Sequence, residues 1–402
     1  MGGHQVSRIA IYNLYWATYG GAEQVSGAFA EFLRNGHEVT LLGPDKVDVV
    51  KSRDRLGLDL TGCEYLRVVN DEEASEASAE FDVFINGTYR SRVINRAARG
   101  VYYVHFPQPL DTSRQRVNQG VSRTAVRTLA LAPGRLRSSS KFTRIHKGFE
   151  RRVVDSSWIA SYTDFVSNSE YTARWTQEIW GVPSTVVYPA VRPVVAADWV
   201  RKTPSIATLG RFFDPIHGHG KKQRDLVDGF VMLDEVGRSR VGDEQWRFVL
   251  VGGADAANRE YALSVKRAAL GHPIDVHLNR PRSVVEDTLA EASIYWHGTG
   301  YGEVEAKHPE RFEHFGIAVV EAMLAGCVPV VYGEAGPAEI VRHGVDGYHW
   351  HTLEQLAEFT YELMADPAKR RAMAESAVAR GREYSIDRFR SAVDSLLSDA
   401  RD

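Results

Sequence analysis

Short apolar runs alternate with amphipathic stretches over the first hundred residues of the chain. Buried strands are predicted at residues 8–12, 39–43, 81–86 and 101–105. Residues 23–34 have the apolar spacing of a helix, and Asn35-Gly36 supplies its stop signal. This succession of strand, turn, helix and strand is typical of a parallel sheet covered by helices on both faces.

The same pattern begins again beyond a connector that starts at Arg192. Further strands are predicted at 205–210, 246–253 and 294–297, with a helix at 224–235. A parallel sheet that restarts indicates a second domain of the same class. We therefore expect one domain at residues 1–190 and another at 191–384, with a cleft between them. The charged tail from Pro367 onward has the apolar spacing of a helix docked on a globular surface.

The composition is that of a soluble globular protein. The 402 residues are 44% hydrophobic and 25% charged, and the formal net charge of −3 argues against a nucleic-acid partner. Cys63 and Cys327 match no metal-ligand spacing, and we expect both to be reduced core residues. The N-terminus lacks the apolar region of a signal peptide, and no long uncharged apolar run occurs elsewhere, so we expect a cytoplasmic protein.

One segment of the chain is strongly basic. Residues 90–152 contain fifteen Lys and Arg against only Asp111 and Glu150. Such a run is commonly a solvated helical face. The alternative is a loop that meets a phosphate-bearing acceptor or an anionic membrane, with Phe149 and Trp158 adding apolar contact. Peripheral membrane contact through this segment is therefore one of two open hypotheses.

Residues 315–325 read as buried, yet Glu321 lies in the middle of them. An ionised carboxylate is costly to bury without a partner, so either the helix turns this side chain to solvent or a polar group meets it inside. A helix that begins near Gly316 would direct its first free amides at the loop that holds Glu313, and such a helix start binds anions. Glu321, about one turn further along, would then be able to accept hydrogen bonds from a ribose diol.

The stretch from Glu313 to Glu321 reads Glu-His-Phe-Gly-Ile-Ala-Val-Val-Glu, and it is preceded by a Leu-Gly-Arg-Phe motif at 209–212. In these motifs the chain resembles the retaining glycosyltransferases of family four, and the first stretch is similar to that of mannosyltransferases that extend lipid-linked oligosaccharides. The spacer after the second motif is longer than the family's. Either Lys221 or Lys222 can therefore match the family's lysine. The number of residues between the lysine and Phe230, in the helix that follows, favours Lys221.

The resemblance implies an α/β fold called GT-B, in which two Rossmann-like domains face each other and the C-terminal helix, here 385–402, joins the first domain. It implies a retaining hexosyltransferase without a side-chain nucleophile. The expected catalytic residues are His105, Arg211, Lys221 and Glu313. The expected substrate-binding residues are Gly20, Gly21, Gly252, Gly253, Arg282, Glu313, His314, Phe315, Gly316, Ile317 and Glu321.

The chemistry of a nucleotide sugar explains why an arginine and a lysine are expected in the site. Negative charge builds on the departing diphosphate, and Arg211 and Lys221 are expected to neutralise it through charge-assisted hydrogen bonds of about 1.5–3 kcal/mol each. By resemblance, Glu313 orients the sugar hydroxyls, Glu321 holds the ribose, and His105 supports the sugar from the first domain.

No metal or cofactor is expected, because the nucleoside diphosphate sugar is a co-substrate. The histidines at 217, 219, 297, 308 and 314 have spacings that fit no tight metal site, and the chain has no Asp-x-Asp pair. The expected donor is GDP-mannose or a UDP-hexose, and the expected acceptor is a glycan, a glycolipid or a small-molecule hydroxyl. Two alternatives stay open: a sugar phosphorylase or nucleotide-sugar epimerase of the same fold, and a non-catalytic nucleotide-binding homologue.

Overall fold

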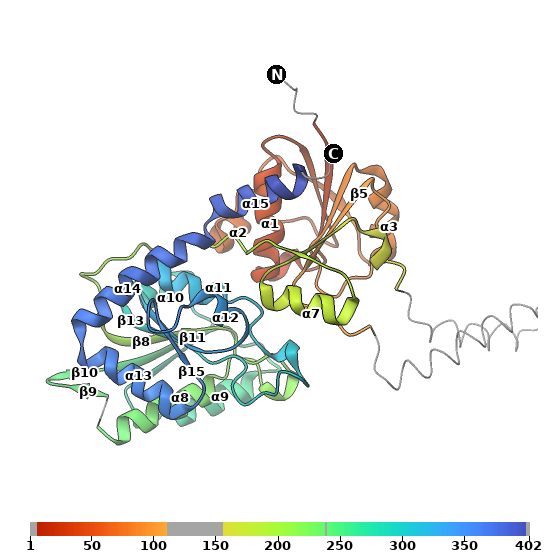
Figure 1. The fold of residues 1–402 in the computed structure, drawn as a ribbon. Helices are drawn as coiled ribbons and strands as arrows, with labels where there is room; N and C mark the ends of the chain where they lie inside the picture. Colours follow the sequence, from red (N-terminus) through yellow and green to blue (C-terminus); the bar gives the residue numbers. More distant parts are fainter. Residues whose placement is uncertain (1–5, 111–155, 238, 399–402) are drawn as a thin grey trace, which may run out of the picture.

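The computed structural model describes residues 6–110, 156–237 and 239–398, which form two lobes, each built on a parallel sheet (Figure 1). The strands of the first sheet are β1 (Arg8–Tyr12), β2 (Glu38–Gly43), β3 (Glu64–Arg67), β4 (Val83–Asn86), β5 (Arg99–Val104), β6 (Asp164–Ser167) and β7 (Thr185–Val186). Their order is β3-β2-β1-β4-β5-β6-β7, with parallel pairing throughout. The order reverses between β1 and β4, at the kind of switch point where open α/β sheets bind ligands.

Helices flank this first sheet, and local residues set their ends. They are α1 (Gly21–Leu33), α2 (Val49–Leu56), α3 (Asp71–Ala77) and α7 (Glu170–Trp180). At the start of α7, the side chain of Ser169 accepts a hydrogen bond from the N–H of Thr172, and Gly181 ends this helix in the left-handed conformation. The first turn of α7 faces the second lobe.

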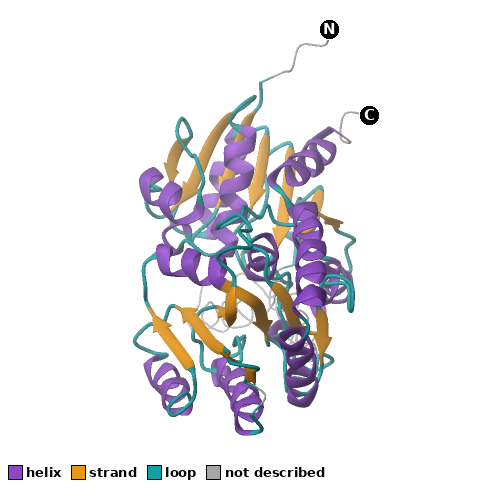
Figure 2. Cartoon of the chain, turned by 90° about the vertical axis from the view of Figure 1, so that its left-hand side faces the viewer, coloured by secondary structure: helices purple, strands orange, loops and turns teal. Residues whose placement is uncertain are grey.

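The second lobe repeats the arrangement. Its strands are β8 (Thr203–Leu209), β11 (Arg247–Gly252), β12 (Ile274–Leu278), β13 (Ala292–His297), β14 (Val328–Tyr332) and β15 (Tyr348–Trp350), with a hairpin of β9 (Arg240–Val241) and β10 (Glu244–Gln245) beside them. The parallel order is β12-β11-β8-β13-β14-β15, so the switch point lies between β8 and β13. The helices are α8 (Gln223–Glu235), α9 (Arg259–Ala268), α10 (Arg282–Glu291), α11 (Ile317–Leu324), α12 (Ala335–Ile340), α13 (Leu353–Ala365) and α14 (Pro367–Gly381). Figure 2 shows the strands of both lobes flanked by helices.

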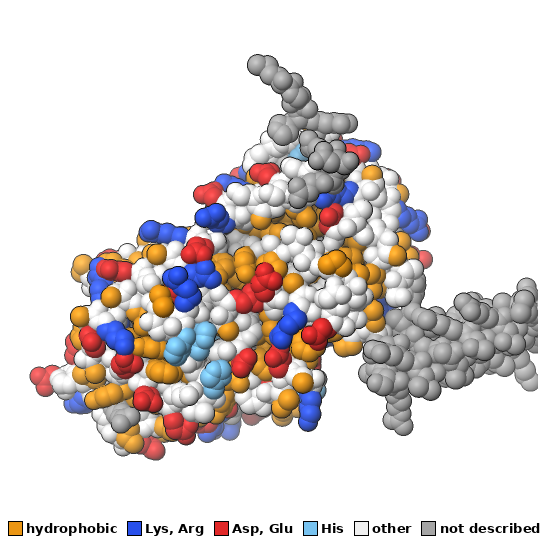
Figure 3. All heavy atoms as spheres, viewed as in Figure 1, with side chains coloured by type: hydrophobic (Ala, Val, Ile, Leu, Met, Phe, Trp, Pro, Cys, Tyr) orange, Lys and Arg blue, Asp and Glu red, His pale blue; other side chains and the backbone are white. Residues whose placement is uncertain are grey.

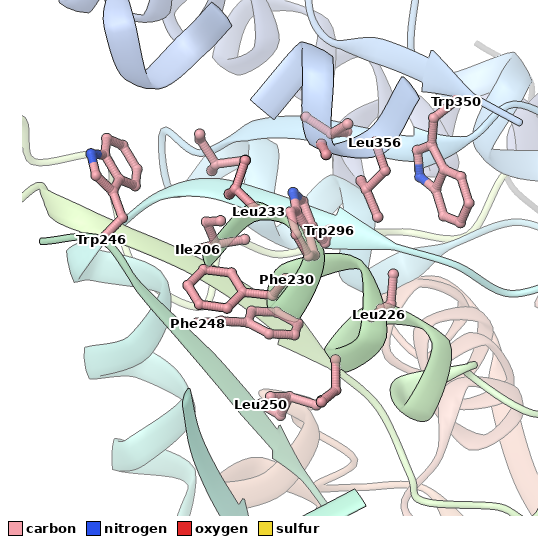
Figure 4. Packing of buried hydrophobic residues seen from close by; sticks show 14 of the residues in the cluster. Ile206, Leu226, Phe230, Leu233, Trp246, Phe248, Leu250, Trp296, Trp350 and Leu356 are labelled. Atoms are coloured by element: carbon pink, nitrogen blue, oxygen red, sulfur yellow. The ribbon is translucent and has the colours of Figure 1, made fainter. Parts of the chain in front are cut away.

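Alternate residues of the second sheet enter two apolar layers. On β13, Ile294 and Trp296 belong to the layer shared with α8, α9 and α13, whereas Tyr295 belongs to the layer shared with α11. In the first of these layers the rings of Phe230, Phe248 and Trp296 contact one another (Figure 4). The centroid distances are 5.7 Å for Phe230–Phe248, 4.9 Å for Phe248–Trp296 and 6.2 Å for Phe230–Trp296. This packing holds the strand ends that carry the site in fixed positions.

The chain returns to the first lobe at its end. Helix α15 (Ile386–Ser398) lies beside α1 (Figure 1), and its apolar side chains join the core of the first lobe. The ring of Phe389 packs edge-on against Phe29 at a centroid distance of 5.0 Å. Arg99 donates hydrogen bonds to two carbonyls in the last turn of α15, where the helix dipole favours a cation.

The structure corrects one part of the hypothesis for the basic segment. Trp158 is only 1% exposed and packs against Tyr102 and Trp180 at centroid distances of 5.3 and 5.0 Å, so it is a core residue and does not add an apolar contact surface. Phe149 and most of the segment fall within 111–155, outside the described residues, and the acceptor or membrane role stays a prediction.

The surface and the cysteines agree with the composition. Acidic and basic side chains are interspersed over the face shown in Figure 3. Cys327 is buried and Cys63 is partly buried, and both are free thiols. Within the described ranges, no helix is both long and apolar enough to cross a membrane.

Candidate functional site

A cavity of about 800 Å³ lies between the two lobes, beside the carboxyl ends of strands from both sheets. The expected site residues that line it are Gly20, Gly21, His105, Arg211, Lys221, Arg282, Glu313, His314, Phe315, Gly316, Ile317 and Glu321. The first lobe contributes the loop before α1 and the residue that follows β5. The second lobe contributes the loops after β8 and β13 and the start of α11. The structure therefore brings residues from distant parts of the sequence to one cavity.

Gly252 and Gly253 are not among the residues that line this cavity, and their expected role in substrate binding stays a prediction. Gly252 ends β11 against the end of β8: a Cβ atom placed on it would lie 1.8 Å from the carbonyl oxygen of Gly210. The carbonyl of Gly253 accepts a hydrogen bond of 2.8 Å from the N–H of Phe212. These two glycines thus join the ends of neighbouring strands.

The two adjacent lysines have different partners. Lys221 forms an ion pair with Glu313 on the wall of the cavity. Lys222 instead forms a buried ion pair of 2.7 Å with Glu303, whose carboxylate also binds Arg311 at 3.1 Å. The geometry therefore favours Lys221 as the lysine that meets a ligand, and it gives Lys222 a structural contact.

Glu313 is ionised although it is buried. Burial alone would raise its pKa, but the charge of Lys221 and a hydrogen bond from His297 hold that pKa well below its usual range. The Nε2 atom of His297 lies 3.0 Å from Oε2 of Glu313, and the hydroxyl of Thr299 lies 3.4 Å from the same oxygen. The site thus has a fixed negative charge beside a fixed positive one.

The start of α11 opens into the cavity. Gly316 precedes the helix with a φ of +119°, which favours glycine, and the N–H groups of Val319 and Val320 both donate to its carbonyl. Within the described residues, the N–H groups of Ile317 and Ala318 donate to no protein acceptor, and both residues line the cavity. These amides and the helix dipole favour an anion at this position.

Glu321 also faces this cavity from α11. Burial raises the pKa of its carboxyl to about 7, and Arg282, which lines the same cavity, lowers it in part. Arg282 is held by Glu286 at 3.2 Å and by the carbonyl of Arg55 in the first lobe at 2.7 Å. The side chain of Glu321 therefore lines the cavity, near the cation of Arg282, and does not enter the apolar core.

The first lobe supplies the opposite wall. The Nε2–H of His105 donates to the carbonyl of Gly87 at 2.8 Å, and burial lowers the pKa of this ring, so it is neutral at pH 7 with its lone pair on Nδ1. The N–H of Gly20 donates to the carboxylate of Glu23 at 2.8 Å, which fixes the loop before α1. His314, from the second lobe, stacks on Phe106 at a centroid distance of 4.2 Å.

Two groups of functional candidates are not anticipated by the motifs. His219 and His297 line the cavity, although the sequence suggests only an unsuitable metal spacing for them. A second group connects the lobes: Glu339 accepts hydrogen bonds from the N–H groups of Glu170 and Tyr171 at 3.0 and 2.6 Å. Such contacts between lobes leave no local sequence signal.

The described part of the chain offers no ready-made metal centre. Within the described ranges, no group of three or more His, Cys, Asp or Glu side chains is arranged to hold a metal ion. The histidines near Glu313 lie around a carboxylate that Lys221 already pairs with. Among the described residues, the basic side chains that line the cavity are Arg55, Arg192, Arg211, Lys221 and Arg282.

Two facing parallel-sheet lobes with a cavity between their strand ends define the GT-B fold. Within it, residues 221–380 match the family model described as Glycosyl transferases group 1, which confirms the family resemblance over this part of the chain.

Solved structures agree over nearly the whole length. Anabaena Alr3699/HepE in complex with UDP and glucose has a TM-score of 0.65 at 17% identity, covering 98% of this chain and 100% of that one. Sucrose-phosphate synthase from Thermosynechococcus elongatus has a TM-score of 0.64 at 14% identity, covering 98% of each. At these identities the likeness shows the fold.

Curated relatives match by sequence over shorter spans. The GDP-Man:Man(3)GlcNAc(2)-PP-Dol alpha-1,2-mannosyltransferase of Dictyostelium discoideum is 30% identical over 270 residues, which is 63% of this chain and 50% of that protein. Sucrose synthase of Solanum tuberosum is 36% identical over 81 residues, or 19% of this chain and 10% of that protein. The chain thus spans half or less of the length of these relatives.

Proposed function

We propose that the protein is a retaining hexosyltransferase that moves a hexose from a nucleoside diphosphate sugar to a hydroxyl acceptor. The observation that carries this proposal is the convergence of Arg211, Lys221 and the free amides of α11 on one cavity. Preorganised cations and amides directed at one place suit a leaving diphosphate. The matched family model and the two named relatives support transfer from a nucleotide sugar.

The reaction would break the bond between the anomeric carbon and the phosphate oxygen and form a bond from that carbon to the acceptor oxygen. The electron pair leaves with the diphosphate, whose charge Arg211, Lys221 and the α11 amides stabilise. The acceptor's proton passes to the departing phosphate. Glu313 holds the sugar hydroxyls, and its ion pair with Lys221 keeps it ionised for that task.

The two candidate donors, GDP-mannose and a UDP-hexose, differ in their nucleotide base. GDP-mannose is the first choice, because the Dictyostelium relative is named for GDP-Man, and a UDP-hexose is the second, because the Anabaena protein is described with UDP and glucose. Glu321 serves either donor equally, since the ribose diol is common to both. A thermal-shift screen against UDP, GDP, ADP and dTDP separates them, because only a bound nucleotide raises the melting temperature.

Turnover is proposed to need no metal, because Arg211, Lys221 and the α11 amides supply the positive charge that a divalent cation would bring. Transfer assays with the selected donor and a panel of glycan, glycolipid and simple glycoside acceptors, with and without EDTA, test this point. Anomeric retention is read from the NMR coupling constants of the product. Three results would contradict the proposal. Phosphate-dependent turnover without nucleotide would indicate a sugar phosphorylase, and an epimerised donor would indicate a nucleotide-sugar epimerase. Nucleotide binding without any turnover would indicate a non-catalytic homologue.

The location of the protein in the cell also stays a prediction. A cytoplasmic protein with peripheral membrane contact through residues 90–152 fits the basic composition of that segment. Flotation of the full chain with vesicles that contain phosphatidylserine, against vesicles of phosphatidylcholine alone, tests that contact.

A further inference from the structure

Three donors converge on one oxygen of Glu313. The Nζ atom of Lys221 forms an ion pair with Oε2, and Nε2 of His297 and the hydroxyl of Thr299 lie 3.0 and 3.4 Å from the same atom. Within the described residues, Oε1 of Glu313 accepts no hydrogen bond. One oxygen of this carboxylate is therefore anchored, and the other remains available to a group in the cavity that Glu313 lines.

The donor character of His297 follows from its surroundings. The residue is 4% exposed, and burial lowers the pKa of its ring, so the imidazole is neutral at pH 7. Because the partner at Nε2 is an ionised carboxylate, the single ring proton is on Nε2 and is donated to Glu313. The indole N–H of Trp350 donates to the carbonyl of His297 at 3.2 Å, which fixes the backbone at the end of β13.

We infer that His297, together with Thr299, is a positioning residue that anchors Oε2 of Glu313 so that Oε1 accepts a hydroxyl of the transferred hexose. The inference rests on the proposed function, in which Lys221 serves the diphosphate. When Lys221 turns to that anion, its hold on Glu313 weakens, and His297 and Thr299 are the donors that remain on Oε2. A neutral histidine suits this position, since it fixes the carboxylate without competing for the diphosphate as a cation would.

Comparing the affinity for the nucleotide with the affinity for the sugar distinguishes a positioning role of His297 from a role in packing alone. A residue that only filled space would affect both equally when it is replaced. A residue that positions Glu313 should affect the sugar alone, because the contacts proposed for the nucleotide, at Glu321 and at the start of α11, do not involve Oε2 of Glu313.

The experiment compares the full-length wild-type protein with His297→Leu and His297→Gln, where Gln keeps an N–H donor at nearly the same reach. Isothermal titration with UDP, UDP-glucose, GDP and GDP-mannose gives the dissociation constants, and steady-state assays give kcat and KM. For His297→Leu we expect nucleoside diphosphate affinity within about 2-fold of wild type and a loss of about 10- to 100-fold in kcat/KM for the sugar nucleotide, as for one hydrogen bond to a charged group. His297→Gln should recover most of that loss.

Thr299→Val and Thr299→Ser form a second, nearly isosteric pair that carries the test if His297→Leu fails to fold. We expect Thr299→Val to lose about 3-fold in kcat/KM and Thr299→Ser to stay near wild type. Unchanged sugar-nucleotide binding and turnover in the folded Leu and Val variants would overturn the inference, as would equal losses for nucleotide and sugar nucleotide. A wild-type protein that gives no thermal shift with UDP, GDP, ADP or dTDP would instead refute the proposed function.

Discussion

Lys221 and Lys222 are neighbours in the chain, but their ammonium groups face different carboxylates. Lys221 pairs with Glu313 at the cavity, and Lys222 pairs with the buried Glu303. We expect Lys221→Met to lower kcat by about 100-fold or more, because one preorganised charge on the leaving group is lost. Lys222→Met should instead lower stability by about 1–3 kcal/mol, since it leaves a buried carboxylate with one partner fewer.

Steady-state kinetics and urea denaturation of both variants check this pair. If turnover were lost only in Lys222→Met, the catalytic lysine would be Lys222 and not Lys221.

Glu321 gives the molecule a pH-dependent stability. Its pKa is about 7 in the folded protein because of burial, against an ordinary value of 4.5, so the folded state binds a proton that the unfolded state releases between these two pH values. The free energy of unfolding therefore falls as pH rises through this window, by at most about 1.4 kcal/mol per pH unit from this group.

Urea denaturation at pH 5, 6, 7 and 8 measures that slope. The Glu321→Gln variant should lack this contribution, so its advantage over wild type should grow from pH 5 to pH 7. A difference between the two proteins that does not change with pH would contradict the assignment.

Individual site residues were predictable where a motif is local. Glu313, Gly316 and Glu321 lie within one short stretch, so their spacing along a helix start can be read directly. The contact of His297 with Glu313 was not predictable, because it depends on the register of β13 beside β8 and β14. The close approach of Gly252 to Gly210 was not predictable either, because Gly210 lies at the end of another strand.

At the scale of elements, the close approach of two strand ends shapes the second lobe. The Cβ atom that Gly252→Ala would add meets the backbone at Gly210, which directly precedes Arg211. Because backbone cannot give way as a flexible side chain can, we expect a loss of about 2–4 kcal/mol in the free energy of unfolding. Thermal melting checks this, with Gly36→Ala as the control, because Gly36 has open space around it and, like Gly252, no positive φ.

The strands themselves were predictable where apolar runs stand between polar turns. The apolar pattern does not predict β3, because Glu64–Arg67 contains one aliphatic residue, Leu66, and the strand is mostly exposed at the edge of the sheet. It also misses β14, because the chain is almost continuously apolar from residue 315 to 332 and periodicity cannot separate the helix from the strand that follows. Helix α11 was predictable mainly from its glycine start and not from amphipathic spacing.

At the scale of the whole molecule, Glu339 connects the lobes. Its carboxylate accepts hydrogen bonds from the first turn of α7, where the helix dipole favours a negative charge. Nearby, the hydroxyl of Tyr171 donates to the carbonyl of Pro309 at 2.9 Å, and Arg174 pairs with Glu305. These contacts stabilise the observed arrangement of the two lobes around the cavity.

We expect Glu339→Ala to lower the free energy that holds the two lobes together by about 2 kcal/mol, because two hydrogen bonds to a charged group are lost. Small-angle scattering should then show a larger radius of gyration, and the KM for the donor should rise. Glu358→Ala, on the exposed face of α13, is the matched control. Identical scattering curves for wild type and Glu339→Ala would show that other contacts hold the lobes together.

The return of α15 to the first lobe has a consequence for biosynthesis. Phe389 and its neighbours fill a groove beside Phe29, yet the ribosome makes them only after the whole second lobe. A nascent chain therefore presents an uncovered apolar strip on α1 throughout translation of the second lobe. The lobe that is made first is thus the last to complete its packing.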